Sequence, residues 1–301
     1  MNGMKKLFNF LLLYTIGFVA KAFRLLFSQK KGNVKQLRMF DITEPSVRLL
    51  GDCMLSHMVI DGVVIYILKP PVKTNNRKII YLHGGAFISG PVRFHWQMLG
   101  RMCEMSGSEI LVVLYRKSPE HIYPAQMNDL MSVYDHLRRS NDPSNIIFMG
   151  DSAGGGLAAA AAQKLRDDGL PLPGKLVLLS PWLDLLLANT DIPKLEKKDK
   201  FLDRSSVASS GRRYAGMHNP QHPYLSPVYG NLAGLPPTLL MIGTMDLLLF
   251  DCRKYRDKAI EAGVELDYQE WDNMFHDWMC LTSILSEAEE SVKHITGFLE
   301  R

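Results

Sequence analysis

Beyond residue 50, short apolar runs alternate with longer segments whose apolar residues recur at helical spacing. Apolar runs of five or six residues between helices are typical of a mostly parallel sheet with helices on both faces. An Asp61-Gly62 pair between two such runs predicts an antiparallel hairpin at one edge. The predicted strands are 54–60, 63–68, 78–82, 109–114, 145–149, 175–179, 238–242 and 265–270. The predicted helices are 94–106, 125–139, 157–167, 251–263 and 284–299.

Between residues 185 and 227 this alternation stops. Residues 194–200 are strongly charged, and residues 205–216 have the pattern of a helix. Because the segment falls between two predicted strands, we expect a helical cap inserted at about residues 185–225. The sequence therefore predicts a main domain at 51–301 that contains this insertion. A hydrophobic and basic helical region at 1–50 precedes it and either belongs to the cap or contacts a membrane.

The net charge of +4 conceals an uneven distribution. Residues 1–40 carry eight basic and no acidic residues, so the remainder, with 27 basic and 31 acidic residues, is mildly acidic. A nucleic-acid-binding protein would place a basic stripe on its folded body, and none is visible in the sequence. We therefore expect no nucleic-acid partner.

Residues 4–27 combine an apolar run with flanking lysine and arginine residues, and three interpretations stay open. The segment is an interfacial membrane helix, a cleaved signal peptide ending at Ala20-Lys21-Ala22, or a hydrophobic helix packed on the body. It is short for a membrane span, and if it did span, the charges that follow it would favour a cytoplasmic body. We expect a cytoplasmic protein, with membrane association through this segment as the alternative.

The four cysteines are scattered and form no C-x-x-C pair, which argues against a zinc site or a disulfide framework.

The pentapeptide Gly150-Asp151-Ser152-Ala153-Gly154 carries the strongest chemical signal. It has the G-x-S-x-G pattern and lies between a predicted strand and a predicted helix, which is the arrangement of a nucleophile elbow. Glycines on both sides are required because the turn leaves no room for side chains. The sequence therefore predicts that the Ser152 hydroxyl is held at the start of a helix.

A serine nucleophile needs a base and a group that orients the base. Asp246 and His276 each follow a predicted strand at its carboxyl end, which is the edge where Ser152 emerges. Asp251, Asp272 and Asp277 compete with Asp246 for the acidic role. We expect Asp251 to interact with a helix N-terminus and Asp277 to point away from His276.

The segment His83-Gly84-Gly85-Ala86-Phe87 follows another predicted strand. Glycine residues let backbone N–H groups approach a reacting carbonyl oxygen. We therefore expect the N–H groups of Gly84, Gly85 and Ala153 to form an oxyanion hole. Candidate pocket walls are Trp96, Trp182, Phe201, Tyr214 and Trp278, each of which also fits ordinary packing.

Over roughly residues 60–280 the chain resembles the hormone-sensitive-lipase family of α/β-hydrolases, on the side of the bacterial acetyl esterases and carboxylesterases. The resemblance is carried by the segments at 83–87, 115–121, 150–155, 180–182, 226–227, 235–246 and by His276. It implies an α/β-hydrolase fold, with a mostly parallel eight-stranded sheet, helices on both faces and a helical cap. It also implies that Arg116 and Glu120 brace the scaffold. Ala86 and Lys117-Ser118 depart from the usual family pattern, and the sequence gives no interpretation of Lys117-Ser118.

The resemblance implies a serine carboxylesterase that acts on short-chain, acetyl-like esters. The expected catalytic residues are Ser152, Asp246 and His276, and no metal or organic cofactor is expected. Its expected partner is a small-molecule ester, and its oligomeric state is left open. The alternatives are a membrane-associated amide or aryl-ester deacetylase, a lactone hydrolase at the same site, and a non-catalytic receptor similar to the gibberellin receptors.

Overall fold

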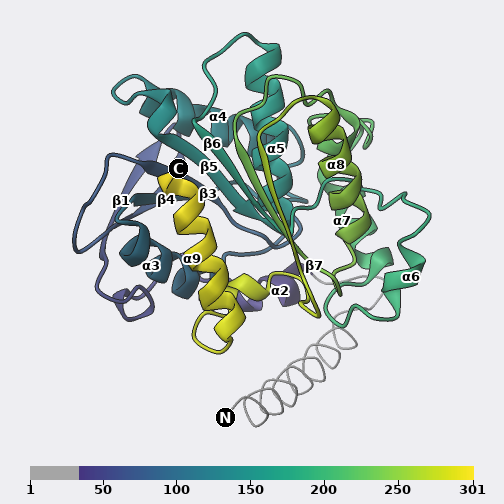
Figure 1. Cartoon of the computed structure of the whole chain (residues 1–301), viewed down its shortest axis with the longest axis horizontal. Coiled ribbons are helices and arrows are strands. Elements are labelled where there is room, and N and C mark those ends of the chain that lie inside the picture. The colour runs from purple at the N-terminus through teal and green to yellow at the C-terminus, as the bar shows by residue number, and fades with distance from the viewer. Residues whose placement is uncertain (1–33) are drawn as a thin grey trace.

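The computed structural model describes residues 34–301, so the interpretations of residues 4–27 fall outside the described residues. Within that range the strands form one eight-stranded sheet with the order β1-β2-β4-β3-β5-β6-β7-β8 (Figure 1). The strands are β1 (Met54–Ile60), β2 (Val63–Lys69), β3 (Lys78–Leu82), β4 (Glu109–Leu114), β5 (Ile146–Asp151), β6 (Lys175–Leu179), β7 (Thr238–Gly243) and β8 (Leu266–Trp271).

Strand direction follows the predicted pattern. β1 and β2 pair in antiparallel register around Asp61-Gly62, whose φ angles of 49° and 82° are those of a tight hairpin turn. β2 is also antiparallel to β4, and every later pair is parallel. The carboxyl ends of β3 and β5 to β8 therefore meet at one edge.

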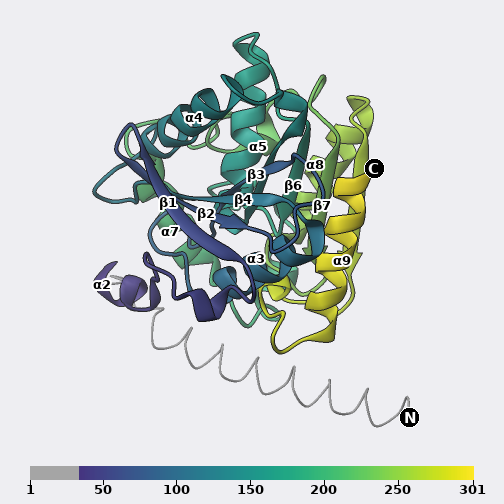
Figure 2. The ribbon, with the colours of Figure 1, turned by 90° about the vertical axis from the view of Figure 1, so that its left-hand side faces the viewer.

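Helices cover both faces of the sheet, as Figure 2 shows from the side of β1. Helices α3 and α9 pack on one face, and α4, α5 and α8 pack on the other. Along β3, Ile80 and Leu82 belong to one apolar cluster, whereas Ile79 and Tyr81 belong to the other. Two buried faces explain why these strands are continuously apolar.

The helices are α2 (Val34–Leu37), α3 (Arg93–Ser106), α4 (Ala125–Arg138), α5 (Ser152–Asp167), α6 (Pro193–Glu196), α7 (Arg204–Ala215), α8 (Leu249–Glu261) and α9 (Ser286–Glu300). Short 3-10 turns lie at Arg38–Phe40, Val47–Leu49, Pro143–Asn145, Pro227–Tyr229 and Trp278–Cys280.

The predicted element bounds agree with the structure to within two residues, with one exception. Helix α5 begins at Ser152, as the elbow predicts, five residues before the start expected from the apolar pattern. Consecutive glycines at 154–156 disfavour a helix by intrinsic propensity. Here they are required by close packing, because a Cβ on Gly156 would lie 2.2 Å from the carbonyl oxygen of Trp182.

The segment between β6 and β7 carries α6 and α7. A Cβ on Gly211 of α7 would lie 3.1 Å from the Trp182 ring, and Tyr214 stacks on Phe87 with ring centroids 3.7 Å apart. Since Phe87 follows the glycine loop after β3, α7 lies against the edge where Ser152 emerges.

Residues 38–42 form a strap across the loop after β3. Asp41 accepts a hydrogen bond from the Gly90 N–H at 2.6 Å and pairs with Lys117 at the same distance. Lys117 also donates to the Gly90 carbonyl, which gives this departure from the family pattern a structural role. Arg38 pairs with Glu120 at 2.6 Å and donates to the Ile88 carbonyl.

A separate ion pair joins Arg116 to Asp129 of α4 at 2.6 Å. Arg116 and Glu120 thus both make scaffold contacts. Among residues 34–301, none of the helices combines the length and the apolarity that crossing a membrane requires.

Replacing Gly154 with alanine should destabilise the fold by about 3 kcal/mol or more, because its Cβ would lie 1.9 Å from the Leu82 carbonyl oxygen. Gly297→Ala is the matched control, since Gly297 is an exposed position inside α9 with nothing within 4 Å of the added carbon. It should stabilise the protein by about 0.5–1 kcal/mol. Denaturant unfolding checks both values, and equal effects at the two positions would contradict the packing argument.

Candidate active site

Ser152 stands at the junction of β5 and α5 with φ at 49°, a left-handed conformation that side-chain-bearing residues rarely adopt. A Cβ on Gly150 would lie 2.4 Å from the Gly154 carbonyl carbon, so the turn tolerates no side chain there. The geometry is that of the predicted elbow, and it presents the hydroxyl at the helix N-terminus.

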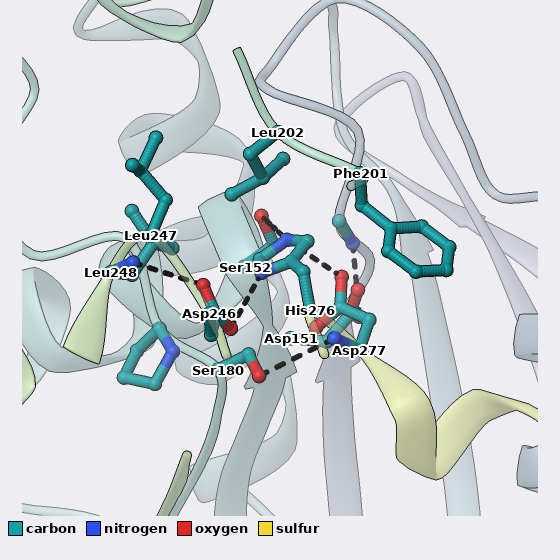
Figure 3. Close-up of polar contacts among 12 residues, drawn as sticks. Asp151, Ser152, Ser180, Phe201, Leu202, Asp246, Leu247, Leu248, His276 and Asp277 are labelled. Carbon is teal, nitrogen blue, oxygen red and sulfur yellow. Dashed lines mark hydrogen bonds and ion pairs between the residues drawn. The ribbon is translucent and has the colours of Figure 1, made fainter. Parts of the chain in front are cut away.

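The structure brings Ser152, His276 and Asp246 together from three loops at the carboxyl edge of the sheet (Figure 3). The Ser152 Oγ lies 2.9 Å from His276 Nε2, and His276 Nδ1 lies 2.9 Å from Asp246 Oδ2. Asp246 is fully buried and accepts a second hydrogen bond from the Leu248 N–H at 2.9 Å. Because Asp246 accepts a hydrogen bond from Nδ1, the ring proton stays on Nδ1. Nε2 is then the nitrogen that can accept a hydrogen bond from Ser152.

The expected set of N–H donors requires a correction at Gly84. Its N–H donates to Asp151 Oδ1 at 2.9 Å, so it is not directed at a substrate, and Gly84 is absent from the cavity lining. Gly85 and Ala86 do line the cavity, and within residues 34–301 neither N–H has a hydrogen-bond partner. The Ala153 N–H is in the first turn of α5, where helix geometry supplies no partner. The free donors are therefore Gly85, Ala86 and Ala153.

A buried polar cluster holds the glycine loop after β3 in place. Tyr81 donates to Asp151, and His95 Nε2 lies 3.1 Å from the second Asp151 oxygen. His83 Nδ1 lies 2.7 Å from the Gly84 carbonyl, and burial lowers the pKa of His83 to about 3, so the ring is neutral. These contacts fix the loop that carries the free donors.

Within the described residues, His95, Asp151 and Cys280 place three metal-ligand atoms within 4.8 Å of one another. The Val92 N–H donates to His95 Nδ1, so His95 Nε2 carries the proton and donates it to Asp151. Hydrogen bonds thus account for the His95–Asp151 pair without a metal.

Asp277 was expected to point away from His276, and this expectation is wrong. Its Oδ2 lies 3.1 Å from His276 Nε2, on the side that also faces Ser152. Asp277 adopts φ at 54°, and this left-handed turn brings consecutive side chains to the same pocket. Spacing along the sequence gave no signal of this conformation.

Two carboxylates thus flank one imidazole. Burial alone would lower the pKa of His276, but Asp277 and Asp246 outweigh it and raise the pKa well above the usual value. Burial and the neighbouring Asp151 raise the pKa of Asp277 to about 7, against the opposing effect of His276. An unprotonated Nε2 and a carboxylate repel each other at 3.1 Å, so the His276–Asp277 pair favours a shared proton. That proton must leave before Nε2 can accept the Ser152 proton.

Asp199, on the segment after α6, is a further buried carboxylate that the sequence did not single out. It accepts hydrogen bonds from the N–H groups of Leu247 and Phe201, each at 2.7 Å. Burial and the nearby Asp246 raise the pKa of Asp199 to about 6. Phe201 stacks on Phe275 with ring centroids 4.3 Å apart, so this segment contacts both the Asp246 loop and the His276 loop.

A cavity of about 510 Å³ opens above Ser152 and His276. Of the five aromatic residues proposed as walls, Trp182 and Phe201 line it. Trp96, Tyr214 and Trp278 are buried in the core instead. Leu37 of α2 also lines the cavity, so residues before the hairpin contribute to the site.

The remaining acidic competitors lie away from the imidazole. Asp251 is in the first turn of α8, as expected, but it is buried and its Oδ2 has no hydrogen-bond partner in the described part of the chain. Burial and the nearby Asp184 raise the pKa of Asp251 to about 7. Asp272 is exposed.

Comparison with known proteins identifies the family to which the chain belongs. The family profile described as the alpha/beta hydrolase fold matches residues 79–280. An acetyl-hydrolase from Streptomyces hygroscopicus is 34% identical over 230 residues, which are 76% of this chain and 77% of that protein. An esterase from Acinetobacter venetianus is 30% identical over 222 residues, or 73% of each protein.

Among solved structures, an esterase described as belonging to the bacterial hormone-sensitive lipase family superposes with a TM-score of 0.87. It is 33% identical, and the match covers 96% of this chain and 97% of that one. The chain is therefore an α/β-hydrolase, and it belongs to the hormone-sensitive-lipase family of esterases.

Replacing Asp251 with asparagine should raise stability at pH 8 by up to about 4 kcal/mol, since the pKa of Asp251 is raised to about 7 and one pKa unit corresponds to about 1.4 kcal/mol. The folded-state pKa of about 7 exceeds the unfolded value, so the wild type loses stability as pH rises between about 4 and 7. The gain from the substitution should therefore be small near pH 4. Unfolding at several pH values tests this, with Asp272→Asn as the exposed control. A gain that is independent of pH would contradict the assignment.

Proposed function

We propose that this protein is a serine carboxylesterase that removes short acyl groups, acetyl foremost, from small esters. Ser152 is the nucleophile, His276 the base and Asp246 the group that orients it. The observation that carries the proposal is the continuous contact from Ser152 Oγ through His276 to buried Asp246, with 2.9 Å at both steps.

In the first step His276 Nε2 takes the Ser152 proton while Oγ forms a bond to the ester carbonyl carbon. The carbonyl oxygen becomes an oxyanion, for which Gly85, Ala86 and Ala153 offer unpaired N–H groups. Asp246 stabilises the imidazolium. The bond to the alcohol oxygen then breaks, and His276 donates its proton to that oxygen.

In the second step water replaces the alcohol. His276 takes a proton from the water as its oxygen attacks the acyl carbon, and it returns a proton to Ser152 Oγ as the acid leaves. In each step Nε2 accepts one proton and gives one up: the Ser152 proton leaves with the alcohol, and a water proton restores Ser152. The cycle therefore balances with these residues alone.

Two observations favour small substrates. The relative from Streptomyces hygroscopicus is named an acetyl-hydrolase, and the cavity of about 510 Å³ is of a size that suits a small organic ester. We assign the cap to residues 34–50 together with the insertion at 185–225, since Leu37, Phe201 and α7 all line this cavity. The main domain at 51–301 carries the reacting residues.

Replacing Ser152 with alanine should lower kcat for p-nitrophenyl acetate by about 10⁴-fold or more, because no acyl-enzyme forms. A fluorophosphonate should label the wild type at Ser152 and leave the variant unlabelled. Rates should fall from acetate through butyrate to octanoate esters. Ser205→Ala, an exposed serine at the cavity rim, is the control. Equal turnover by Ser152→Ala and the wild type would refute the proposal.

Replacing Asp277 with alanine should move the acid limb of kcat/KM to lower pH by about one unit. The sign follows from the base: His276 must be neutral to accept the Ser152 proton, and Asp277 raises its pKa. Without that carboxylate the ring loses its proton at lower pH, so activity also begins at lower pH. A pH–rate profile checks this, with Asp272→Asn as control. An unmoved acid limb would show that Asp277 does not act on His276.

A further inference from the structure

One face of α7 lines the active-site cavity with polar side chains. The residues on this face recur at helical spacing, and they are Ser206, Ser209, Ser210 and Arg213. The opposite face is buried, through Ala208, Gly211, Tyr214 and Ala215. Because Gly211 packs on Trp182 and Tyr214 on Phe87, the rotation of the helix about its axis is set and the polar face is turned to the cavity.

Arg213 is the distinctive member of this face. It is half-buried, and within residues 34–301 it has no hydrogen bond, ion pair or ring contact. Residues 1–33 contain no aspartate or glutamate, so that stretch has no side-chain carboxylate to pair with it. By contrast, Arg38 and Arg116 near the same edge each hold a carboxylate at 2.6 Å.

The acidic residues that share the cavity with Arg213 are engaged elsewhere. Asp203 caps α7 by accepting from the Ser206 N–H at 2.8 Å and from the Ser205 hydroxyl at 2.7 Å. Asp277 contacts His276 at 3.1 Å. A guanidinium group offers five N–H donors in a planar fork, and at this half-buried position a ligand in the cavity can accept from them in place of solvent. The described protein residues supply no acceptor.

We propose that the natural substrates are esters that carry an anionic group, a carboxylate or a phosphate, and that Arg213 binds this group. The inference rests on the proposed esterase function. The guanidinium fork matches both oxyanions with paired hydrogen bonds, and the Ser206 and Ser209 hydroxyls lie on the same face to complete the contact. Ser210 is already engaged, because its hydroxyl donates to the Ser206 carbonyl at 3.0 Å.

The rest of the lining sets the chemistry of the remaining substrate. It is largely apolar, through Leu37, Ile88, Trp182, Phe201, Leu202 and Leu248. The cavity therefore fits an ester with a compact apolar body and a charged group that reaches α7. This arrangement discriminates against neutral esters of the same shape, which would leave the guanidinium group unpaired.

The test compares kcat/KM within pairs of esters that differ only in charge. For an anion on the alcohol side, 3- and 4-acetoxybenzoate are compared with the acetoxybenzamides, and 4-acetoxyphenyl phosphate distinguishes phosphate from carboxylate. For an anion on the acyl side, the monomethyl esters of succinic, glutaric and adipic acids are compared with the same methyl esters whose free carboxyl group is replaced by an amide. The variants are Arg213→Gln, Arg213→Lys and the matched control Arg212→Gln, since Arg212 is the exposed neighbour outside the cavity.

We expect the wild type to prefer at least one anionic ester about tenfold or more over its neutral partner. Arg213→Gln should reduce that preference by about 10- to 100-fold, mainly through KM, while Arg213→Lys keeps part of it. Arg212→Gln should leave the preference unchanged. The proposal is overturned if the wild type favours the neutral ester in every pair. It is also overturned if Arg213→Gln slows both members of a pair equally.

A separate measurement distinguishes this failure from failure of the esterase function itself. If p-nitrophenyl acetate is not hydrolysed and Ser152 is not labelled, the proposed function is wrong. Calorimetric binding of 4-hydroxybenzoate and inorganic phosphate to Ser152→Ala, with and without Arg213→Gln, then still tests the anion site. Anion binding that is lost with Arg213 supports the site, and binding that is indifferent to Arg213 excludes it.

Discussion

The close approach of α5 to the end of β3 is the constraint on which the site depends. Gly154 lies so near the Leu82 carbonyl that a single Cβ would clash at 1.9 Å. This contact holds Ser152 in its left-handed conformation and places the first turn of α5 beside the glycine loop after β3. The backbone donors of Gly85 and Ala86, which line the cavity, are thereby brought close to the Ala153 N–H in the first turn of α5. No side-chain contact could bring the two chain segments this close.

Buried carboxylates organise the polar part of the site around that backbone. Asp151 accepts from Tyr81, His95 and Gly84 and so supports the loop from below. Asp246 holds one nitrogen of His276, and Asp277 contacts the other. Because Asp151 and Asp246 are each buried beside an imidazole and an N–H donor, their charges are compensated locally. The arrangement sets the proton affinity of His276 as well as its orientation.

The segments above the sheet edge connect these groups to the cavity. Asp199 holds Leu247 next to the orienting carboxylate, and Phe201 stacks on Phe275 next to the base. A displacement of this segment would move both loops together. Under the proposed function, α7 contributes to substrate specificity, since its polar face lines the cavity and does not pack in the core.

The sequence by itself determined the sheet, most helix bounds, and Ser152, Asp246 and His276 as the residues to examine. Those features follow from local signals: continuous apolar runs, helical spacing, and glycines flanking a serine. Only the tertiary structure decided the partner of the Gly84 N–H, the turn of Asp277 toward His276 and the burial of Asp199. It also decided that Arg213 has no partner within residues 34–301. Each of these depends on contacts between segments far apart in the chain. A hydrogen-bond donor or a carboxylate has the same appearance in the sequence whether the fold supplies its partner or leaves it for a ligand.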